Sequence, residues 1–172
     1  MKTLCSLIFF ISVNMYAQGG HLIPNPIKNI PKWVRTEFSS QGLDLQYEIT
    51  YQLYPPYLKG DSDGDRKKDA AILVQEKSSG KFGIALFHGK EVQAFKNHVI
   101  ILGAGKSFGT AGDDLKWMSV WSIFKQGKSS EGTNESSHPP LQGTAIKIQK
   151  RGDGNGLIYW NGIKYEWYRF KQ

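Results

Sequence analysis

The stretch GDSDGDRKKDAAILV, residues 60–74, places four aspartates directly before an apolar run. The apolar part, residues 70–74, does not alternate with polar residues, and this pattern predicts a strand that is covered on both faces. The same pattern recurs in FGIALFH, residues 82–88, and in VIIL, residues 99–102. Strands of this kind favour a fold with more than one layer, because each face of the sheet has to be buried against another element.

Other segments predict a half-buried strand and the turns between strands. Residues 43–51, LDLQYEITY, carry an apolar side chain at every second position, which is typical of a strand with one wet face. KSSGK at 77–81 has the composition of a hairpin turn. Asn161-Gly162 lies between two aromatic runs and predicts a hairpin with a type I′ turn, because both residues accept a positive φ.

Residues 113–125, DDLKWMSVWSIFK, are the best helix candidate in the chain. Apolar side chains fall at the i, i+3, i+4 and i+7 positions of one helix face, namely Trp117, Val120, Trp121 and Phe124. A strand remains the alternative, because a short apolar run fits both patterns. We therefore predict a mainly β or α+β fold: a compact two-layer domain of antiparallel strands with one helix at 113–125.

The first residues have the features of a secretory signal peptide. The apolar run over residues 4–13 is shorter than the ~20 residues of a membrane-spanning helix, and Ala17 offers a small residue for cleavage. We predict that residues 1–17 are removed, which leaves no transmembrane segment, and that residues 18–172 form one domain. The expected location is secreted or periplasmic. Within the domain, residues 126–140 are polar, small and proline-terminated, which predicts a mobile loop.

The charge of the chain is basic but dispersed. The chain has 22 Lys+Arg against 15 Asp+Glu, a formal net charge of +7. No long block of like charges occurs, so the basic residues indicate a solvated surface and argue against a nucleic-acid interface. The single cysteine, Cys5, falls within the predicted signal peptide. The mature domain therefore has neither a disulfide nor a cysteine nucleophile.

The acidic loop has the spacing of a calcium site. Calcium binds about six to eight oxygen ligands, and aspartates at alternate positions of a tight turn direct their carboxylates to one centre. Positions 1, 3, 5 and 9 of such a loop are Asp61, Asp63, Asp65 and Asp69, and the carbonyl of Lys67 stands at position 7. These carboxylates would repel one another without a cation. We predict a structural Ca²⁺ site, and the alternative is an Asp/Gly surface turn that binds nothing.

The loop resembles a known family of calcium repeats. An EF-hand has glutamate at position 12, where this chain has Ile72. The sequence is instead similar to the DxDGDxxxD loop of FG-GAP or VCBS-type repeats, which occur in integrin α-subunit propellers and in secreted bacterial proteins. The C-terminal run is also similar to the endings of small secreted bacterial proteins that carry such a loop. The resemblance implies bound calcium and a strand directly after the loop, and it brings no activity with it.

Two features depart from the family pattern. Many such loops have glycine at position 6, where Arg66 stands here, so the backbone is expected to be strained at a cost of ~1 kcal/mol. A propeller needs several blades, and the chain has one good copy of the loop. A second segment, which starts at Asp153, has Leu157 at position 5. A propeller is therefore not expected.

Other motifs in the chain lack a residue that their chemistry needs. The glycine-rich segment 103–109 fails the P-loop pattern at Ile100 and the dinucleotide-binding fingerprint at Phe108. No GxSxG motif indicates a serine nucleophile. The histidines have no metal-binding spacing, and we expect them at the surface or at strand ends: His21, His88, His98 and His138.

Aromatic residues crowd the C-terminal hairpin, where they form either a contact surface or part of the core. Successive strand residues face opposite sides, so one row can be buried while the other is exposed. Exposed aromatic rows bind sugars or partner proteins. The candidate contact residues for an unknown protein or glycan at the cell exterior are Tyr159, Trp160, Tyr165 and Trp167. Core packing is the alternative.

The sequence favours a secreted, non-enzymatic, calcium-binding β domain with a binding or support role at the cell envelope or exterior. The alternative function is an envelope enzyme or enzyme inhibitor that acts on polysaccharide. A glycosidase needs two carboxylates across a cleft, and outside the acidic loop the sequence offers no decisive pair.

Overall fold

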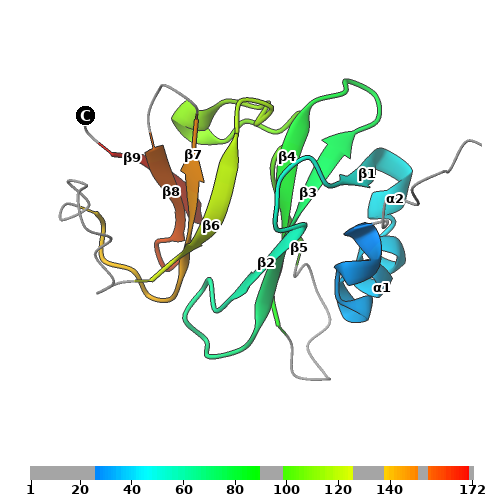
Figure 1. The fold of residues 1–172 in the computed structure, drawn as a ribbon. Coiled ribbons are helices and arrows are strands. Elements are labelled where there is room, and N and C mark those ends of the chain that lie inside the picture. Colours follow the sequence, from blue (N-terminus) through cyan, green and yellow to red (C-terminus); the bar gives the residue numbers. More distant parts are fainter. Residues whose placement is uncertain (1–25, 90–98, 126–137, 151–154, 171–172) are drawn as a thin grey trace, which may run out of the picture.

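The structure, a computed structural model, describes residues 26–89, 99–125, 138–150 and 155–170. Its strands form two antiparallel sheets, with short helices at the beginning of the described chain (Figure 1). The predicted signal peptide and most of the loop predicted at 126–140 lie outside the described residues. No helix in the described part of the chain is long and apolar enough to cross a membrane.

Helical segments precede the first sheet. They are the 3-10 turn Pro26–Asn29 and the helices α1, Lys32–Ser40, and α2, Leu43–Gln46. Helix α1 begins directly after Pro31, whose fixed φ suits a helix start. Its buried residues, Val34 and Phe38, are four positions apart and so lie on one face. Gly42 has a left-handed φ of 68° and separates the two helices.

Sheet A is built around the long strand β3. Its strands are β1, Tyr47–Thr50; β2, Tyr57–Gly60; β3, Asp69–Glu76; β4, Phe82–Phe87; and β5, Val99–Gly103. The order is β1-β3-β4-β5, and β2 also pairs with β3. Strand β2 lies beside the first half of β3 and β1 beside the second half. The buried strands and the turn at 77–81 predicted from the sequence are confirmed as β3, β4, β5 and the β3–β4 connection.

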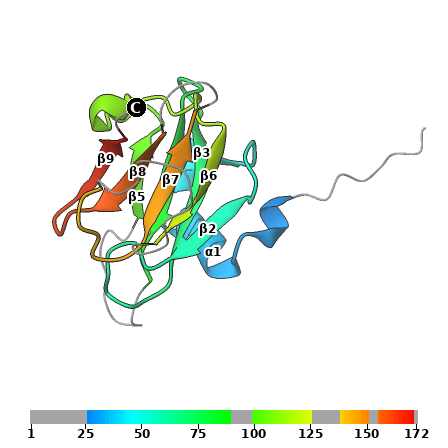
Figure 2. The ribbon, with the colours of Figure 1, turned by 60° about the vertical axis from the view of Figure 1, so that its left-hand side comes forward.

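Sheet B is a meander of four strands. They are β6, Val120–Phe124; β7, Ala145–Gln149; β8, Asn155–Trp160; and β9, Tyr165–Arg169. Figure 2 shows them side by side in the order β6, β7, β8 and β9, from right to left. A 3-10 turn, Gly109–Ala111, lies in the connection from β5 to β6.

The main core lies between the two sheets. Leu73 and Ile84 of sheet A enter it from one side, and Trp121, Ile148 and Ile158 of sheet B enter it from the other; all five are almost fully buried. Burial of this apolar surface is the dominant favourable contribution to folding. The sheets thus form two packed layers of antiparallel strands, which confirms the predicted fold class.

A second apolar cluster covers the outer face of sheet A. Val34 and Phe38 of α1 belong to this cluster together with Ile72, Val74 and Phe87 of the sheet. Alternate residues of β3 thus face α1 and sheet B, because successive strand residues point to opposite faces. This arrangement explains why the run AAILV is apolar throughout. Figure 1 shows α1 on the side of sheet A that faces away from sheet B.

The helix predicted at 113–125 is wrong, because residues 120–124 form strand β6. Val120 is 47% exposed and Trp121 is 1% exposed, which is the alternation of a strand. Trp121 stands opposite Ile148 of β7 in the antiparallel ladder. Pairing with β7 and burial of Trp121 between the sheets outweigh the helical spacing, because tertiary contacts override a weak local preference.

The strand predicted at 43–51 is partly wrong. Its second half forms β1, but its first half forms α2, and Leu45 is 81% exposed. The partner strand β3 ends at Glu76, which pairs with Tyr47. Residues before Tyr47 lie beyond the end of β3, and a helical turn gives their backbone groups local hydrogen-bond partners instead.

The C-terminal hairpin is confirmed as β8 and β9, but its turn differs from the prediction. Four residues, 161–164, connect the paired strands, where a type I′ turn would use two. The side-chain oxygen of Asn161 accepts the N–H groups of Ile163 and Lys164, each at 2.9 Å. Gly162 has a φ of 100°, whereas Asn161 has no positive φ. Asn161 therefore closes the turn with its side chain and with its backbone N–H, which donates to the carbonyl oxygen of Lys164 at 3.1 Å.

Candidate metal centre

The acidic loop connects β2 to β3 and packs against the segment that leads into β7. The backbone N–H of Thr144 donates to the carbonyl oxygen of Asp61 at 2.6 Å, and the Thr144 hydroxyl donates to the same oxygen at 3.1 Å. A Cβ on Gly64 would lie only 2.6 Å from the carbonyl oxygen of Gln142, so glycine is required for this close approach. The loop thus joins sheet A to sheet B.

The aspartates of the loop accept hydrogen bonds from its own backbone. Asp61 accepts the N–H groups of Gly64 at 2.8 Å and of Arg66 at 3.0 Å. Asp63 accepts the N–H of Asp65 at 3.1 Å. These bonds wind the chain tightly, and Arg66 takes a left-handed φ of 69°, as the departure from glycine at position 6 led us to expect.

The predicted ligand residues fall into two groups. Ligand atoms of Asp61, Asp63 and Asp65 all lie within 4.8 Å of one another. Lys67 is placed beside them, since its N–H donates to Asp65 Oδ1 at 2.8 Å and its ammonium lies 3.7 Å from Asp65 Oδ2. Asp69 does not join this trio and instead forms a second group with Asp63 and a histidine.

Asp69 is the first residue of β3 and is 2% exposed. Its Oδ2 accepts two hydrogen bonds from Ser62, from the backbone N–H at 2.7 Å and from the hydroxyl at 2.5 Å. Its Oδ1 accepts the backbone N–H of Gly89 at 2.8 Å. The carboxylate thereby fastens the start of the acidic loop and the chain after β4 to one point.

His88 is a site residue that the sequence reasoning missed. Its Nδ1 lies 2.6 Å from Asp63 Oδ2, and its Nε2 lies 3.2 Å from the hydroxyl of Tyr165. That hydroxyl lies 2.8 Å from the hydroxyl of Ser62. The imidazole also packs against the ring of Trp160, with centroids 6.1 Å apart. His88 is therefore part of a polar network between the loop and β9.

The β3–β4 register contained the signal that would have located His88. Ala70 stands opposite Phe87 in this hairpin, so one further step along the ladder brings Asp69 opposite His88. The turn at 77–81 was predicted correctly, and the antiparallel register follows from its position. The same register, continued by one residue pair, places the imidazole of His88 beside the acidic loop.

The aromatic residues of the C-terminal hairpin differ in burial. Tyr165 is 6% exposed and belongs to the core between the sheets. Trp160 and Trp167 are half-buried and pack against the same core, while part of each ring stays in solvent. The half-buried Tyr159 donates its hydroxyl proton to Glu166 at 3.0 Å. Core packing thus describes Tyr165, and the two tryptophans retain some exposed surface.

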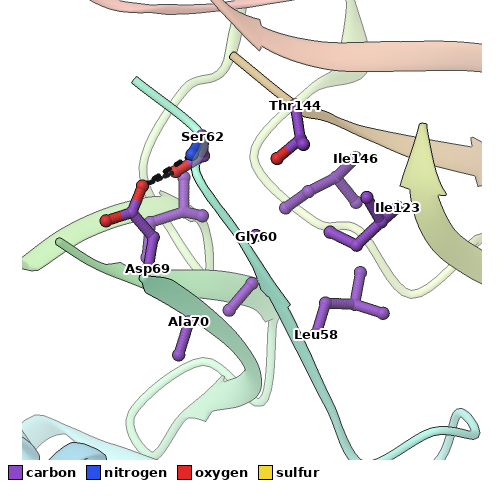
Figure 3. A pocket seen from close by; sticks show the side chains of 10 residues that line it. Leu58, Gly60, Ser62, Asp69, Ala70, Ile123, Thr144 and Ile146 are labelled. Carbon is purple, nitrogen blue, oxygen red and sulfur yellow. Dashed lines mark hydrogen bonds between the residues drawn. The ribbon is translucent and has the colours of Figure 1, made fainter. Parts of the chain in front are cut away.

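A small cavity lies between the sheets beside Asp69. Figure 3 shows Ser62 and Asp69 on one side of it, with Thr144 and Ile146 on the other. Its volume of ≈ 10 Å³ is about enough for a single water molecule. Most of its lining residues are apolar. An organic ligand needs a volume of a few hundred Å³, on the order of 300 Å³ or more, so the cavity is too small for one.

Carboxylates outside the loop take part in local contacts. Asp113 lies 2.5 Å from the ammonium of Lys81, and this hydrogen bond is the main reason why the pKa of Asp113 is lowered. Asp114 accepts the backbone N–H of Phe82 at 3.0 Å. Both side chains therefore fasten the segment before β6 to the start of β4, which is a structural role.

In comparisons with known proteins, no protein-family model, no curated protein and no solved structure matches the chain.

Proposed function

We propose that the acidic loop binds a calcium ion and that the protein is a secreted, non-enzymatic β domain with a binding or support role at the cell envelope or exterior. The observation that carries the proposal is the convergence of Asp61, Asp63 and Asp65, whose ligand atoms lie within 4.8 Å of one another. Like charges at such distances repel strongly in a partly buried site. A divalent cation removes this repulsion.

The chemistry of the trio suits calcium. Calcium prefers hard oxygen ligands, and a carboxylate oxygen that accepts one hydrogen bond still has a lone pair for a metal. Each carboxylate oxygen of Asp61 accepts one hydrogen bond from a backbone N–H. The Oδ1 atoms of Asp63 and Asp65 each accept one such bond as well. Water would complete the coordination. The similarity of the loop to FG-GAP or VCBS-type repeats supports the same ion.

A bound ion would act on stability rather than on chemistry. The loop is held to the segment before β7 through the Asp61 carbonyl, so an ion that rigidifies the loop also strengthens the link between the sheets. Extracellular calcium modules bind with Kd values of ~10⁻⁴ to 10⁻³ M. At a calcium concentration about ten times Kd, binding stabilises the fold by about 1.4 kcal/mol.

The proposed work at the cell exterior rests on two features. The predicted signal peptide, residues 1–17, directs the chain out of the cytoplasm. The half-buried rings of Trp160 and Trp167 lie on the C-terminal hairpin, where they offer an aromatic contact to a protein or glycan.

Calorimetric calcium titration of the purified protein, with thermal melts in calcium and in chelator, tests the ion site. We expect Asp65→Asn to weaken calcium binding about tenfold or more, because one ligand charge is lost while the amide oxygen still accepts the Lys67 N–H. Asp44→Asn removes the same charge at an exposed position outside the loop and serves as the matched control. If neither heat of binding nor a calcium-dependent melting shift appears at millimolar calcium, the loop is a plain surface turn.

A further inference from the structure

His88, Asp63 and Asp69 form a group of ligand atoms that the calcium proposal leaves unexplained. Their atoms lie within 4.8 Å of one another. The three side chains come from different elements: Asp63 from the acidic loop, Asp69 from the start of β3, and His88 from the position after β4. Asp69 is 2% exposed, and the side chains of His88 and Asp63 are 12% and 19% exposed.

The hydrogen-bond donors of the network determine which nitrogen of His88 carries a proton. The hydroxyl of Ser62 donates its proton to Asp69, so the hydroxyl contact between Ser62 and Tyr165 requires Tyr165 to donate. Tyr165 has then used its proton and must accept from Nε2 of His88. In a neutral imidazole the other nitrogen, Nδ1, therefore carries a lone pair.

That lone pair points at a carboxylate. Nδ1 lies 2.6 Å from Asp63 Oδ2, an oxygen that is itself only an acceptor. Two lone pairs at this distance repel unless a cation lies with them. The cation is either a second proton on the imidazole or a metal ion bound by both groups.

Asp69 keeps one carboxylate lone pair open to a ligand. Among the described residues no lysine or arginine forms an ion pair with this buried carboxylate. Its charge is compensated by three hydrogen bonds instead, two from Ser62 and one from Gly89. Oδ1 of Asp69 accepts one hydrogen bond, from Gly89, so a lone pair remains for a ligand bond.

We propose that His88, Asp63 and Asp69 form a second cation site, which takes a divalent transition metal such as Zn²⁺. An imidazole nitrogen with two carboxylate oxygens is a donor set that suits zinc and its neighbours, whereas calcium takes oxygen ligands alone. Tyr165 supplies the outer hydrogen bond that orients a metal-binding imidazole through its second nitrogen.

The two sites share Asp63 and can still be tested separately. Asp63 Oδ1 lies on the loop side, where it accepts the N–H of Asp65, and Oδ2 lies on the side of His88. Asp65 belongs to the first group alone and His88 to the second alone. Failure of the calcium proposal therefore leaves the zinc proposal standing, and the reverse also holds.

Titration of the purified protein with Zn²⁺ by calorimetry, and with Co²⁺ by visible absorption, tests the second site. We expect one ion per chain, and we expect His88→Gln to weaken binding at least about tenfold. The matched control, His138→Gln, removes an imidazole whose Nδ1 lies beside the carbonyl of Pro139, and it should leave Zn²⁺ binding unchanged. Asp65→Asn should weaken calcium binding and leave zinc binding within about twofold.

A measurement on the unmodified protein covers the case in which His88→Gln does not fold. Nitrogen-15 NMR distinguishes an imidazolium from a neutral imidazole that binds a metal through Nδ1. A shift of the His88 Nδ1 resonance on addition of Zn²⁺, with Nε2 still protonated, supports the site. A doubly protonated His88 that zinc does not change overturns it, because a proton then supplies the cation between the imidazole and Asp63.

Discussion

Arg66 holds a backbone conformation that its side chain disfavours. Its φ of 69° costs a non-glycine residue about 1 kcal/mol or more. We expect Arg66→Gly to raise the free energy of unfolding by about 0.5 kcal/mol, since relief of this strain exceeds the extra freedom that glycine gains in the unfolded chain. The matched control is Arg35→Gly in the exposed face of α1, which should lower the free energy of unfolding by about 1 kcal/mol. Urea unfolding in chelator measures the free energy of unfolding of both variants. If Arg66→Gly lowered this free energy as much as Arg35→Gly does, the expectation would be contradicted.

Tyr165 links stability to alkaline pH. Burial is the main reason why the pKa of its phenol is raised above the ordinary value of 10.0. The unfolded chain therefore loses this proton first as the pH rises through 10.0, and the folded state is stabilised less above that pH. We expect Tyr165→Phe to cost about 1–2 kcal/mol at neutral pH, through lost hydrogen bonds to Ser62 and His88. By about pH 11 this difference should shrink by about 1.4 kcal/mol.

Urea unfolding of both proteins across this pH range makes the comparison. Tyr47 and Tyr159 also have raised pKa values, mainly through burial, so both proteins lose stability at high pH. The difference between wild type and variant isolates Tyr165. A difference that stays constant with pH would show that Tyr165 ionises alike in the folded and unfolded states.

Single residues of the site were predictable where the contacts are local. The loop aspartates lie within nine positions, 61 to 69, so their spacing alone suggested a common centre, and the unusual backbone of Arg66 followed from the same pattern. His88 is 25 positions from Asp63, and Tyr165 is 77 positions from His88. The position of His88 beside the acidic loop follows from the register of the β3–β4 hairpin. The contact with Tyr165 depends on the packing of one sheet on the other, which local patterns do not encode.

Strand β6 shows how an element can carry two patterns at once. Helical spacing places Val120 and Trp121 on one face, whereas strand geometry places them on opposite faces. We expect Val120→Lys to change the free energy of unfolding by less than about 0.5 kcal/mol, because Val120 is exposed. Trp121→Phe should cost about 2 kcal/mol, since it opens space in the core and leaves the Pro55 carbonyl, which accepts the indole N–H at 2.9 Å, without that donor. Thermal melts that show a similar loss of stability for Val120→Lys and Trp121→Phe would be inconsistent with the strand.

Elements were predictable where one pattern dominated the segment. The apolar runs that form β3, β4 and β5 are short, continuous and bounded by turn residues. Their short length and the turn residues at their ends favour strands over helices. The start of β1 at Tyr47 was not predictable, because it is determined by where β3 stops and not by any change in the alternation of residues 43–51. The hairpin existed as predicted, but the side chain of Asn161 selected a longer connection.

At the scale of the whole molecule, both sheets contribute to one core, so they should unfold together. Ile84 of sheet A and Ile148 of sheet B are fully buried in the same cluster. We expect Ile84→Val and Ile148→Val each to cost about 1 kcal/mol, and each to lower amide hydrogen-exchange protection by the same factor in β3 and in β7. The control, Ile163→Val, changes a side chain that is 85% exposed. It should alter neither the free energy of unfolding nor the hydrogen-exchange protection of β3 and β7.

The exchange experiment separates one cooperative unit from two. Each sheet has a further apolar cluster outside the shared core. On sheet A this cluster includes residues of α1, and on sheet B it includes Phe124 and Leu157 of the sheet's own strands. If these separate clusters held each sheet together without the shared core, one sheet would open independently of the other. In that case Ile148→Val would lower protection in β7 and leave β3 unchanged, and the inter-sheet links through the acidic loop would contribute little. Equal effects in calcium and in chelator would show that the shared core, rather than the ion, couples the sheets.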